Sequence, residues 1–330
     1  MIAERKNGNP AGGILNVRKP AGMTSHDVVS FVRRLTGIKR VGHAGTLDPM
    51  ATGVLVVCLG NATRIIEFMN VPGGSAKSYR CEMKLGFVSD TQDVWGEMTQ
   101  CANPGNLPDE RAVRDALKSM EGARIQSAPL YSAVKYKGKP LYAYARSGEP
   151  LPEEALKKRN VYIKSITVNY VDTATATAEF DIACSAGTYV RAVCHEVGAI
   201  LGCGAVMSAL VRMSDFGFRI EDSHTPEQLE RMKDALPILP ADSALLALPR
   251  AELDGSGAKR FQSGANVPFN ENLGQPANGL GRIANGTGGE DGQFVRVYDD
   301  GWRLIGIGKR VGGVMKPCKV FARQSDETVR

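Results

Sequence analysis

The order of elements around one glycine-rich loop constrains the fold of this chain most strongly. Residues 42–53 read GHAGTLDPMATG, contain a single carboxylate, Asp48, and run directly into the apolar segment VLVVCL at 54–59. The segment HDVVSFVRRL before the loop has the apolar spacing of an amphipathic helix that ends at Gly37. Dinucleotide-binding and P-loop folds need a strand before their glycines and a helix after them. The reversed order therefore argues against a phosphate cradle.

Further patterns along the chain predict a domain of mixed strands and helices. Residues 77–85 alternate between apolar and polar side chains, which predicts a strand with one solvated face and places Tyr79 on the apolar face. The segments YIKSITVNY and ATAEFDIAC are predicted to pair around a turn at Val171-Asp172. After CSAG, a helix is predicted with Thr188 as its N-cap and Gly202 as its end.

The composition changes after about residue 245, and this change predicts a second domain. The last 85 residues hold 15 of the 37 glycines, and QFVRVY and WRLIGI flank a predicted hairpin turn, Asp299-Asp300-Gly301. We therefore expect a larger mixed domain over residues 1–245 and a small all-β domain over 246–330. A run of cations in the small domain could follow phosphates or form an ordinary solvated face. These cations are Lys309, Arg310, Lys316, Lys319 and Arg323.

Composition also narrows the class of protein. No apolar run approaches the roughly 20 residues that cross a bilayer, and the N-terminus lacks the apolar core of a signal peptide, so we expect a cytoplasmic protein. The seven cysteines are scattered without a C-x-x-C pair, and Ala199 stands where an H-E-x-x-H motif from His195 needs its second histidine. We expect reduced thiols and no metal. A net charge of +6 permits a polyanionic partner without proving one.

Two charged residues stand in unusual local positions. Asp48 could be a turn or N-cap carboxylate, but Gly53 would interrupt a helix within one turn and Pro49 favours extended backbone at Asp48. A loop rich in small residues can instead present a carboxylate as a nucleophile. Arg191 falls in the first turn of its predicted helix, where the helix dipole disfavours a cation by up to about 1 kcal/mol. It therefore serves a function or has a compensating partner, for which Glu196 is the plainest choice.

Five segments together resemble the bacterial tRNA pseudouridine synthase B (TruB) family. In order from about residue 12 to residue 220, they are GILNVRKPAGMTSHDVV, GHAGTLDPMATGVLVVCLGNATR, KSYRCEMKLG, SAPLYSAVKYKGKPLYAYAR and CSAGTYVRAVCHEVGAILGCGA. The resemblance implies an α+β fold over residues 1–245, the pseudouridine synthase fold, with a mixed and largely antiparallel sheet flanked by helices. Residues 246–330 resemble the PUA-like RNA-binding domain of such enzymes. The insert at about 271–292 matches no pattern of the family.

The resemblance also implies roles for six residues. Asp48 in G-x-L-D-P-x-A-T-G matches the catalytic aspartate, Tyr79 in K-S-Y-R matches the tyrosine that stacks on the target base, and Arg191 in G-T-Y-V-R matches the arginine that pairs with the aspartate. The remaining three match positions that contact the flipped nucleotide or shape its pocket. They are His43, Tyr189 and Leu210.

The implied reaction is isomerisation of uridine 55, in the T arm of tRNA, to pseudouridine without a cofactor. The N1–C1′ bond breaks, the uracil rotates, and it is rejoined through C5, with Asp48 as the nucleophile at either C6 of the ring or C1′ of the ribose. Flipping the uridine out costs a few kcal/mol, which stacking on an aromatic ring can offset. Tyr79 would supply that ring, and its hydroxyl is a candidate for removing the C5 proton.

Two other functions remain open on the sequence. One is a noncatalytic RNA-binding or tRNA chaperone protein that uses the same surface, and the other is a guide-RNA-dependent synthase of the archaeal and eukaryotic type. The intact set of Asp48, Tyr79 and Arg191 argues against the first, and a compact chain without long basic tails argues against the second. We expect a monomer that needs no protein partner, because the sequence shows no heptad repeat.

Overall fold

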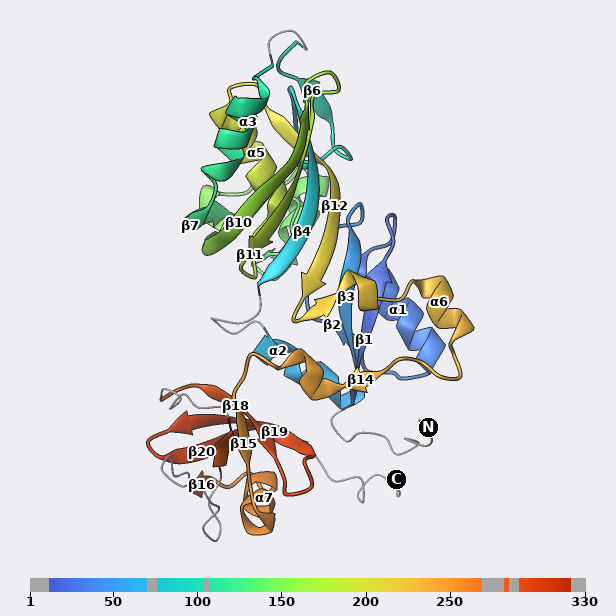
Figure 1. Ribbon diagram of the computed structural model, residues 1–330, viewed down its shortest axis with the longest axis vertical. Helices are drawn as coiled ribbons and strands as arrows, with labels where there is room; N and C mark the ends of the chain where they lie inside the picture. Colours follow the sequence, from blue (N-terminus) through green and yellow to red (C-terminus); the bar gives the residue numbers. More distant parts are fainter. Residues whose placement is uncertain (1–11, 70–75, 104–106, 269–281, 285–290, 322–330) are drawn as a thin grey trace.

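The computed structural model describes residues 12–69, 76–103, 107–268, 282–284 and 291–321. A ten-stranded sheet with its helices occupies most of the long axis, and a six-stranded sheet occupies the end that holds α7 (Figure 1). Most of the insert at about 271–292 falls outside the described residues, and so does Arg323.

The ten-stranded sheet follows the order β14-β1-β3-β12-β4-β11-β10-β7, with β13 beside β12 and β2 beside β3. All neighbours in it are antiparallel except β3 and β12, which are parallel. Its strands are β1 (Gly13–Lys19), β2 (Val41–His43), β3 (Thr52–Leu59), β4 (Lys77–Leu85), β7 (Gly122–Ser127), β10 (Lys158–Asp172), β11 (Thr177–Cys184), β12 (Ala205–Asp215), β13 (Phe218–Arg219) and β14 (Leu239–Pro240).

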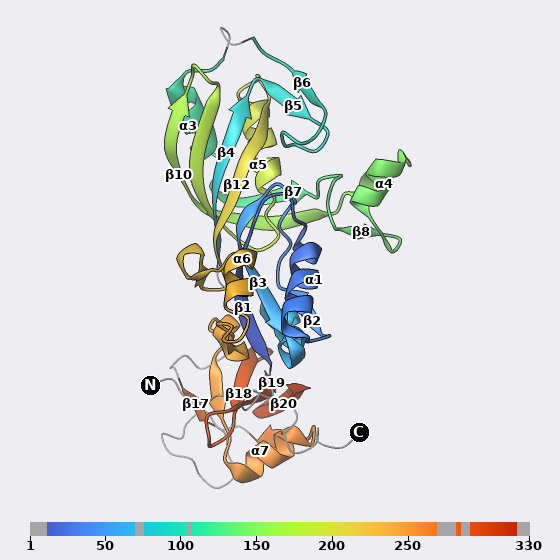
Figure 2. The ribbon, with the colours of Figure 1, turned by 90° about the vertical axis from the view of Figure 1, so that its right-hand side faces the viewer.

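Two hairpins and six α-helices accompany this sheet in the described residues. The α4 helix and the strand β8 project to one side of the sheet in the view of Figure 2. The hairpins are β5 (Phe87–Ser89) with β6 (Met98–Gln100) and β8 (Lys135–Tyr136) with β9 (Lys139–Pro140). The helices are α1 (Ser25–Thr36), α2 (Ile66–Met69), α3 (Glu110–Lys118), α4 (Leu141–Ser147), α5 (Val190–Ile200) and α6 (Pro226–Arg231).

The α1 helix has the boundaries that its sequence encodes. Thr24 and Asp27 form a capping box, in which the Asp27 N–H donates to the Thr24 hydroxyl at 3.1 Å and the Thr24 N–H donates to the Asp27 carboxylate at 2.8 Å. The helix ends at Gly37, which adopts φ of 70°. Its buried valines, Val28, Val29 and Val32, pack in one cluster with β1 and β3, so the predicted apolar face is confirmed.

The β4 strand also follows its predicted alternation. Tyr79, Cys81 and Met83 are all buried, and they pack with α3 and α5 in the main core of the sheet. One residue departs from this pattern of apolar burial. Lys77 lies on the same face as Tyr79 and is only 7% exposed, which makes a lysine part of the sheet's buried side.

Two local predictions differ from the structure in the residues at which a helix or a turn begins. The helix α5 begins at Val190 with Tyr189 as its N-cap, and the Thr188 hydroxyl donates to the carbonyl of Ser185 at 2.9 Å, so the prediction that Thr188 caps the helix is wrong. This bond closes the turn before the helix and occupies the side chain that would otherwise cap it. The β10 strand continues through Asp172, so the turn to β11 comes at residues 173–176.

The C-terminal domain is a six-stranded sheet in the order β16-β20-β19-β18-β15-β17, with α7 (Gly255–Gln262) against it. Its strands are β15 (Arg250–Glu252), β16 (Val267–Pro268), β17 (Arg282–Ala284), β18 (Phe294–Tyr298), β19 (Leu304–Val311) and β20 (Val314–Val320). The domain is built mainly of strands, as expected, and the predicted hairpin between β18 and β19 is confirmed, but α7 is a helix that the expectation of an all-β domain did not include.

The two sheets share one hydrophobic cluster, in which Phe68 and Leu245 pack with Ile307 and Phe321. Part of the cationic run on the small domain serves this contact. Lys319 forms an ion pair with Glu67, with Nζ and Oε1 2.8 Å apart. Arg310 is only 5% exposed. The run is therefore not a single free surface for phosphates.

Candidate active site

Asp48 lies in the loop between β2 and β3, and the backbone on both sides of it is fixed. The Ser25 hydroxyl at the start of α1 donates to the carbonyl of Leu47 at 3.0 Å and accepts from its N–H at 2.8 Å. On the other side, the carbonyl of Pro49 accepts from the Gly22 N–H at 2.9 Å and from Lys19 Nζ at 3.2 Å. The carboxylate of Asp48 therefore projects from a backbone with little freedom.

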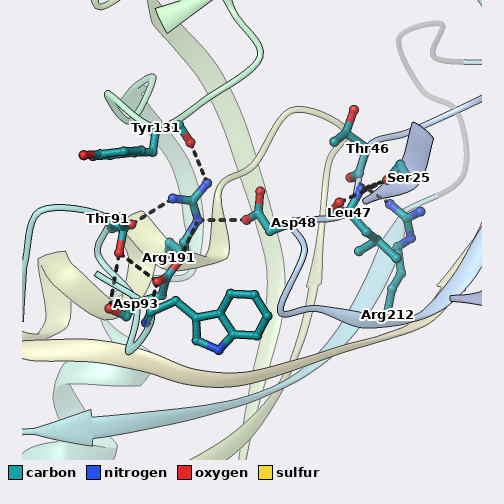
Figure 3. A network of polar contacts seen from close by, with 10 residues as sticks. Ser25, Thr46, Leu47, Asp48, Thr91, Asp93, Tyr131, Arg191 and Arg212 are labelled. Carbon is teal, nitrogen blue, oxygen red and sulfur yellow. Dashed lines mark hydrogen bonds and ion pairs between the residues drawn. The ribbon is translucent and has the colours of Figure 1, made fainter. Parts of the chain in front are cut away.

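Arg212 on β12 holds the same loop from within the protein. Its guanidinium donates to the carbonyls of Val54 at 2.6 Å, Gly45 at 3.1 Å and Thr46 at 3.4 Å, and the side chain is almost fully buried. Figure 3 shows Arg212 beside Thr46, Leu47 and Ser25. An arginine provides five donors in a planar fork, and here that fork ties successive backbone carbonyls to the sheet.

Gly53 permits the close approach between the loop and β12. It adopts φ of 100°, and a Cβ atom there would lie 2.3 Å from the carbonyl oxygen of Arg212. Any larger residue would both strain the backbone and separate the parallel strands β3 and β12. The glycine therefore supports strand pairing behind Asp48, a role distinct from helix interruption.

Arg191 is the residue that contacts the Asp48 carboxylate. Its Nε lies 2.8 Å from Asp48 Oδ2, its two Nη atoms donate to the carbonyls of Thr91 at 2.8 Å and Tyr131 at 2.9 Å, and Asp93 Oδ2 is 3.8 Å away (Figure 3). The Arg191 side chain is 5% exposed, whereas that of Asp48 is 35% exposed. The arrangement leaves the carboxylate accessible while its partner is immobilised from three directions.

Asp93 in turn is fixed by its own neighbours. Its Oδ1 accepts from the Thr91 hydroxyl at 2.7 Å and from the Trp95 N–H at 3.0 Å, and the residue is 6% exposed. These bonds hold the Asp93 carboxylate in a turn, and no pattern in the sequence placed it beside Arg191. Glu196, the plainest partner expected for Arg191, instead pairs with Arg124 at 3.4 Å.

A cavity of about 540 Å³ adjoins Asp48. Five of the six residues assigned by the resemblance line it, namely Asp48, Tyr79, Tyr189, Arg191 and Leu210. Tyr79 and Leu210 come from the adjacent strands β4 and β12, and Tyr189 is the N-cap of α5. The cavity therefore combines one accessible carboxylate with aromatic and aliphatic side chains, a lining suited to a flat ring.

His43 is not among the residues that line this cavity. It lies on β2, paired in register with Val57, and its Nδ1 has no hydrogen-bond partner among the described residues. Burial and nearby cations, Arg212 among them, lower the pKa of His43 below its usual value. The imidazole is therefore neutral at pH 7 and offers no positive charge to a phosphate.

Tyr79 is a neutral phenol at physiological pH. Burial raises the pKa of its hydroxyl well above the usual value, and the neighbouring charge of Arg212 opposes this only in part. The side chain is 7% exposed, although it borders the cavity. Its ring is consequently a rigid apolar surface, and its hydroxyl holds its proton in the free protein.

Sequence reasoning missed several polar residues of the cavity wall, including Lys77, Ser132 and Arg212. Lys77 Nζ lies 3.1 Å from Asp215 Oδ2, and burial lowers the pKa of Lys77, while the attraction of Asp215 acts against that shift. One signal was present in the sequence. Lys77 and Tyr79 are two residues apart on β4, so the alternation of the strand already placed a lysine on the buried face.

Lys19 provides a pH-dependent test of how the loop is held. Burial lowers the pKa of Lys19 to about 8, against the partial compensation of Asp48. The native protein therefore releases this proton near pH 8, while the unfolded chain keeps it until about pH 10.5. The free energy of unfolding should therefore increase as the pH rises from about 8 to about 10.5, by up to about 1.4 kcal/mol per pH unit.

The measurement is urea unfolding of the wild type and of Lys19→Met between pH 7.5 and 10.5, at constant ionic strength. Buried cysteines and Tyr79 titrate in both proteins, so the difference between the two curves isolates Lys19. We expect the free energy of unfolding of the wild type to increase relative to that of Lys19→Met as the pH rises. Parallel curves would mean that the Lys19 ammonium has the same pKa in the folded and unfolded chains.

The described residues contain no cluster of three or more histidine, cysteine, aspartate or glutamate side chains that could hold a metal ion. In the same parts of the chain, no helix combines the length and the apolar composition needed to cross a membrane.

Comparison with known proteins identifies the family. Residues 33–190 match the sequence model described as TruB family pseudouridylate synthase, N-terminal domain. A tRNA pseudouridine synthase B of Clostridium tetani is 39% identical over 312 residues, which cover 94% of this chain and 99% of that protein. The chain belongs to the TruB family of pseudouridine synthases. It is therefore an isomerase, as the resemblance implied.

Other TruB proteins and solved structures agree with this membership. The tRNA pseudouridine synthase B of Syntrophotalea carbinolica is 44% identical over 255 residues, covering 76% of this chain and 80% of that protein. That of Bacillus velezensis is 37% identical over 325 residues, covering 96% of this chain and 99% of that protein. A chain in the crystal structure of a Cbf5-Nop10-Gar1 complex is 25% identical, has a TM-score of 0.70, and covers 98% of this TruB chain and 91% of that chain. The pseudouridine synthase fold is thereby confirmed.

Proposed function

We propose that this TruB enzyme converts uridine 55 in the T arm of tRNA to pseudouridine, with Asp48 as the nucleophile. The observation that carries the proposal is the pair formed by an accessible Asp48 carboxylate and a buried Arg191 guanidinium, 2.8 Å apart, at the wall of a cavity. The isomerisation needs an anionic nucleophile beside a base that has left its stack. A fixed cation beside that anion keeps the carboxylate ionised when the bound base excludes water from the cavity.

The cavity walls supply binding surfaces for the uracil ring. Tyr79 on β4 and Leu210 on β12 are both buried yet border the cavity. A base stacked on an aromatic side chain gains about 1–3 kcal/mol, which offsets the cost of flipping the nucleotide out of the RNA. Tyr79 supplies the aromatic ring for this stacking.

A tRNA substrate is supported by the names of the relatives and by the charge of the chain. The curated relatives are tRNA pseudouridine synthases, and this chain carries a net charge of +6. Arg159 on β10 is exposed and also borders the cavity, where it can contact a phosphate next to the flipped nucleotide. The choice of uridine 55 rests on the resemblance of the Asp48 loop and its partner segments to the TruB family.

The test is tritium release from an unmodified tRNA transcript made with uridine labelled at C5. The full chain should release one equivalent of tritium per tRNA, chemical mapping should place pseudouridine at position 55, and a transcript with cytidine at that position should release none. Release from the cytidine transcript would overturn the choice of site. Binding of the transcript without any release would favour the noncatalytic RNA-binding function instead.

A further inference from the structure

Ser132 lines the cavity and has a buried hydroxyl without a hydrogen-bond partner in the part of the chain that the structure describes. The residue is 6% exposed and lines the cavity beside Ala133 and Val134, and its Oγ has no hydrogen-bond partner among the described residues. The two other serines that are buried in the described part of the chain differ from it. Ser25 Oγ bonds to the backbone of Leu47, and Ser223 Oγ donates to the carbonyl of Ile220.

The backbone around Ser132 is fixed by the catalytic arginine and by α4. The carbonyl of Tyr131 accepts from Arg191 at 2.9 Å, and the carbonyl of Ser132 itself accepts from the Tyr142 N–H at 3.2 Å. The Ser132 N–H donates to the carbonyl of Leu130 at 3.1 Å. Because these backbone groups are bonded, the backbone of Ser132 has a fixed place at the cavity wall.

An unpaired buried hydroxyl is costly, so its presence at a substrate cavity indicates a partner that arrives with the substrate. Buried polar groups nearly always form hydrogen bonds, and leaving one without a hydrogen bond costs roughly 1–3 kcal/mol. The wall carries charged side chains, among them Asp48, Lys77 and Arg212, and neutral hydroxyls such as that of Thr188, which donates to the carbonyl of Ser185. Ser132 adds a neutral group, without a partner among the described residues, that can both donate and accept, which suits the oxygen atoms of a nucleoside.

We propose that the Ser132 hydroxyl turns into the cavity by rotation about its Cα–Cβ bond and donates a hydrogen bond to an oxygen of the flipped-out nucleotide. The oxygen is a carbonyl of uracil, O2 or O4, or the ribose 2′-hydroxyl. This inference rests on the proposed function and adds to it a residue that selects the nucleotide. Ser132 contacts substrate in this arrangement, whereas Arg191 reaches the same segment only through the backbone of Tyr131.

The first measurement compares steady-state kinetics of the wild type and Ser132→Ala on the unmodified transcript. One neutral hydrogen bond corresponds to about a 2- to 10-fold effect. A bond made equally to bound substrate and transition state should raise KM by that factor and leave kcat within about twofold. A purely structural role, exerted through the Tyr131 carbonyl and Arg191, would lower kcat instead, and that outcome would contradict the proposal.

The second measurement identifies the oxygen, using transcripts with 2-thiouridine, 4-thiouridine or 2′-deoxyuridine at the target position. Binding is measured in the Asp48→Asn background, so that it requires no turnover. One analogue should bind about 2- to 10-fold more weakly than uridine when Ser132 is present and should show no such penalty with Ser132→Ala. Equal penalties in both proteins for all three analogues would overturn the proposal.

Matched variants separate recognition from folding. Ser132→Cys keeps an atom at the position of Oγ, slightly larger than oxygen, but donates only weakly, so it should resemble Ser132→Ala in KM. Ser147→Ala is the control, because Ser147 lies on α4 in the same part of the chain, is exposed, and bonds to the carbonyl of Ala143 at 2.9 Å. It should show wild-type KM. Failure of the proposed function would appear separately, as absence of tritium release by the wild type.

Discussion

Replacing Asp48 with asparagine is expected to abolish turnover while tRNA binding persists. Asparagine has the same shape and can still bond to Arg191, but its amide cannot act as the nucleophile of the proposed mechanism. Loss of a covalent nucleophile lowers kcat by on the order of 10⁴ or more. Tritium release in single-turnover experiments measures the rate, and filter binding of the unmodified transcript measures the Kd, which should change by less than about threefold.

Asp109→Asn is a matched control for this substitution. Asp109 is the N-cap of α3, where its carboxylate accepts from the Ala112 N–H at 2.8 Å, and it does not line the cavity. The control should turn over at the wild-type rate. Retention of more than about one hundredth of the wild-type rate by Asp48→Asn would contradict a nucleophilic carboxylate.

Local patterns in the sequence were sufficient for the elements that place the site. The apolar spacing of α1, the glycine at its end and the alternation of β4 all reappear in the structure, because each depends on neighbours within one or two turns of chain. Asp48 also stood out locally, since Pro49 and Gly53 made a capped helix unfavourable there. The first turn of α5 was less predictable, because a Thr188 hydroxyl has competing acceptors in the turn that precedes the helix.

The partners of the Asp48 loop could not be predicted from spacing. Arg212 donates to the carbonyl of Gly45 across 167 positions of sequence, and Arg191 reaches the carbonyl of Thr91 across 100. Such contacts depend on which strands become neighbours, here the parallel pair β3 and β12. The position of Arg191 at a helix N-terminus indicated that a partner must exist, and the family resemblance named Asp48, but local spacing alone did not distinguish Asp48 from Glu196.

The loop is therefore held by two arginines with different tasks. Arg212, from the sheet, binds backbone carbonyls before and after Asp48 and fixes where the loop runs. Arg191, from α5, binds the carboxylate itself and fixes which way it points. Separate control of backbone and side chain explains how a residue in a glycine-rich loop can keep a single orientation, because the glycines permit close approach and the arginines supply rigidity.

Replacing Arg191 with methionine is expected to damage both activity and stability. The substitution removes the cation between Asp48 and the buried Asp93 and leaves the carbonyls of Thr91 and Tyr131 without their donor. Loss of one partner of a buried charge pair typically destabilises a protein by about 3–5 kcal/mol. We expect the free energy of unfolding in urea to fall by about that amount and kcat to fall by on the order of 10³.

Arg191→Lys distinguishes charge from geometry. Lysine restores a positive charge but not the planar fork, so it cannot bond to Asp48 and to the carbonyls of Thr91 and Tyr131 in the same orientation. It should recover part of the lost stability and little of the lost kcat. Arg124→Met is the matched control, because Arg124 pairs with the partly exposed Glu196 of the same helix at 3.4 Å, and its loss should cost less than about 1 kcal/mol with kcat unchanged. A near-wild-type kcat for Arg191→Lys would mean that any cation beside Asp48 suffices, and that the three-way immobilisation of the guanidinium serves folding alone.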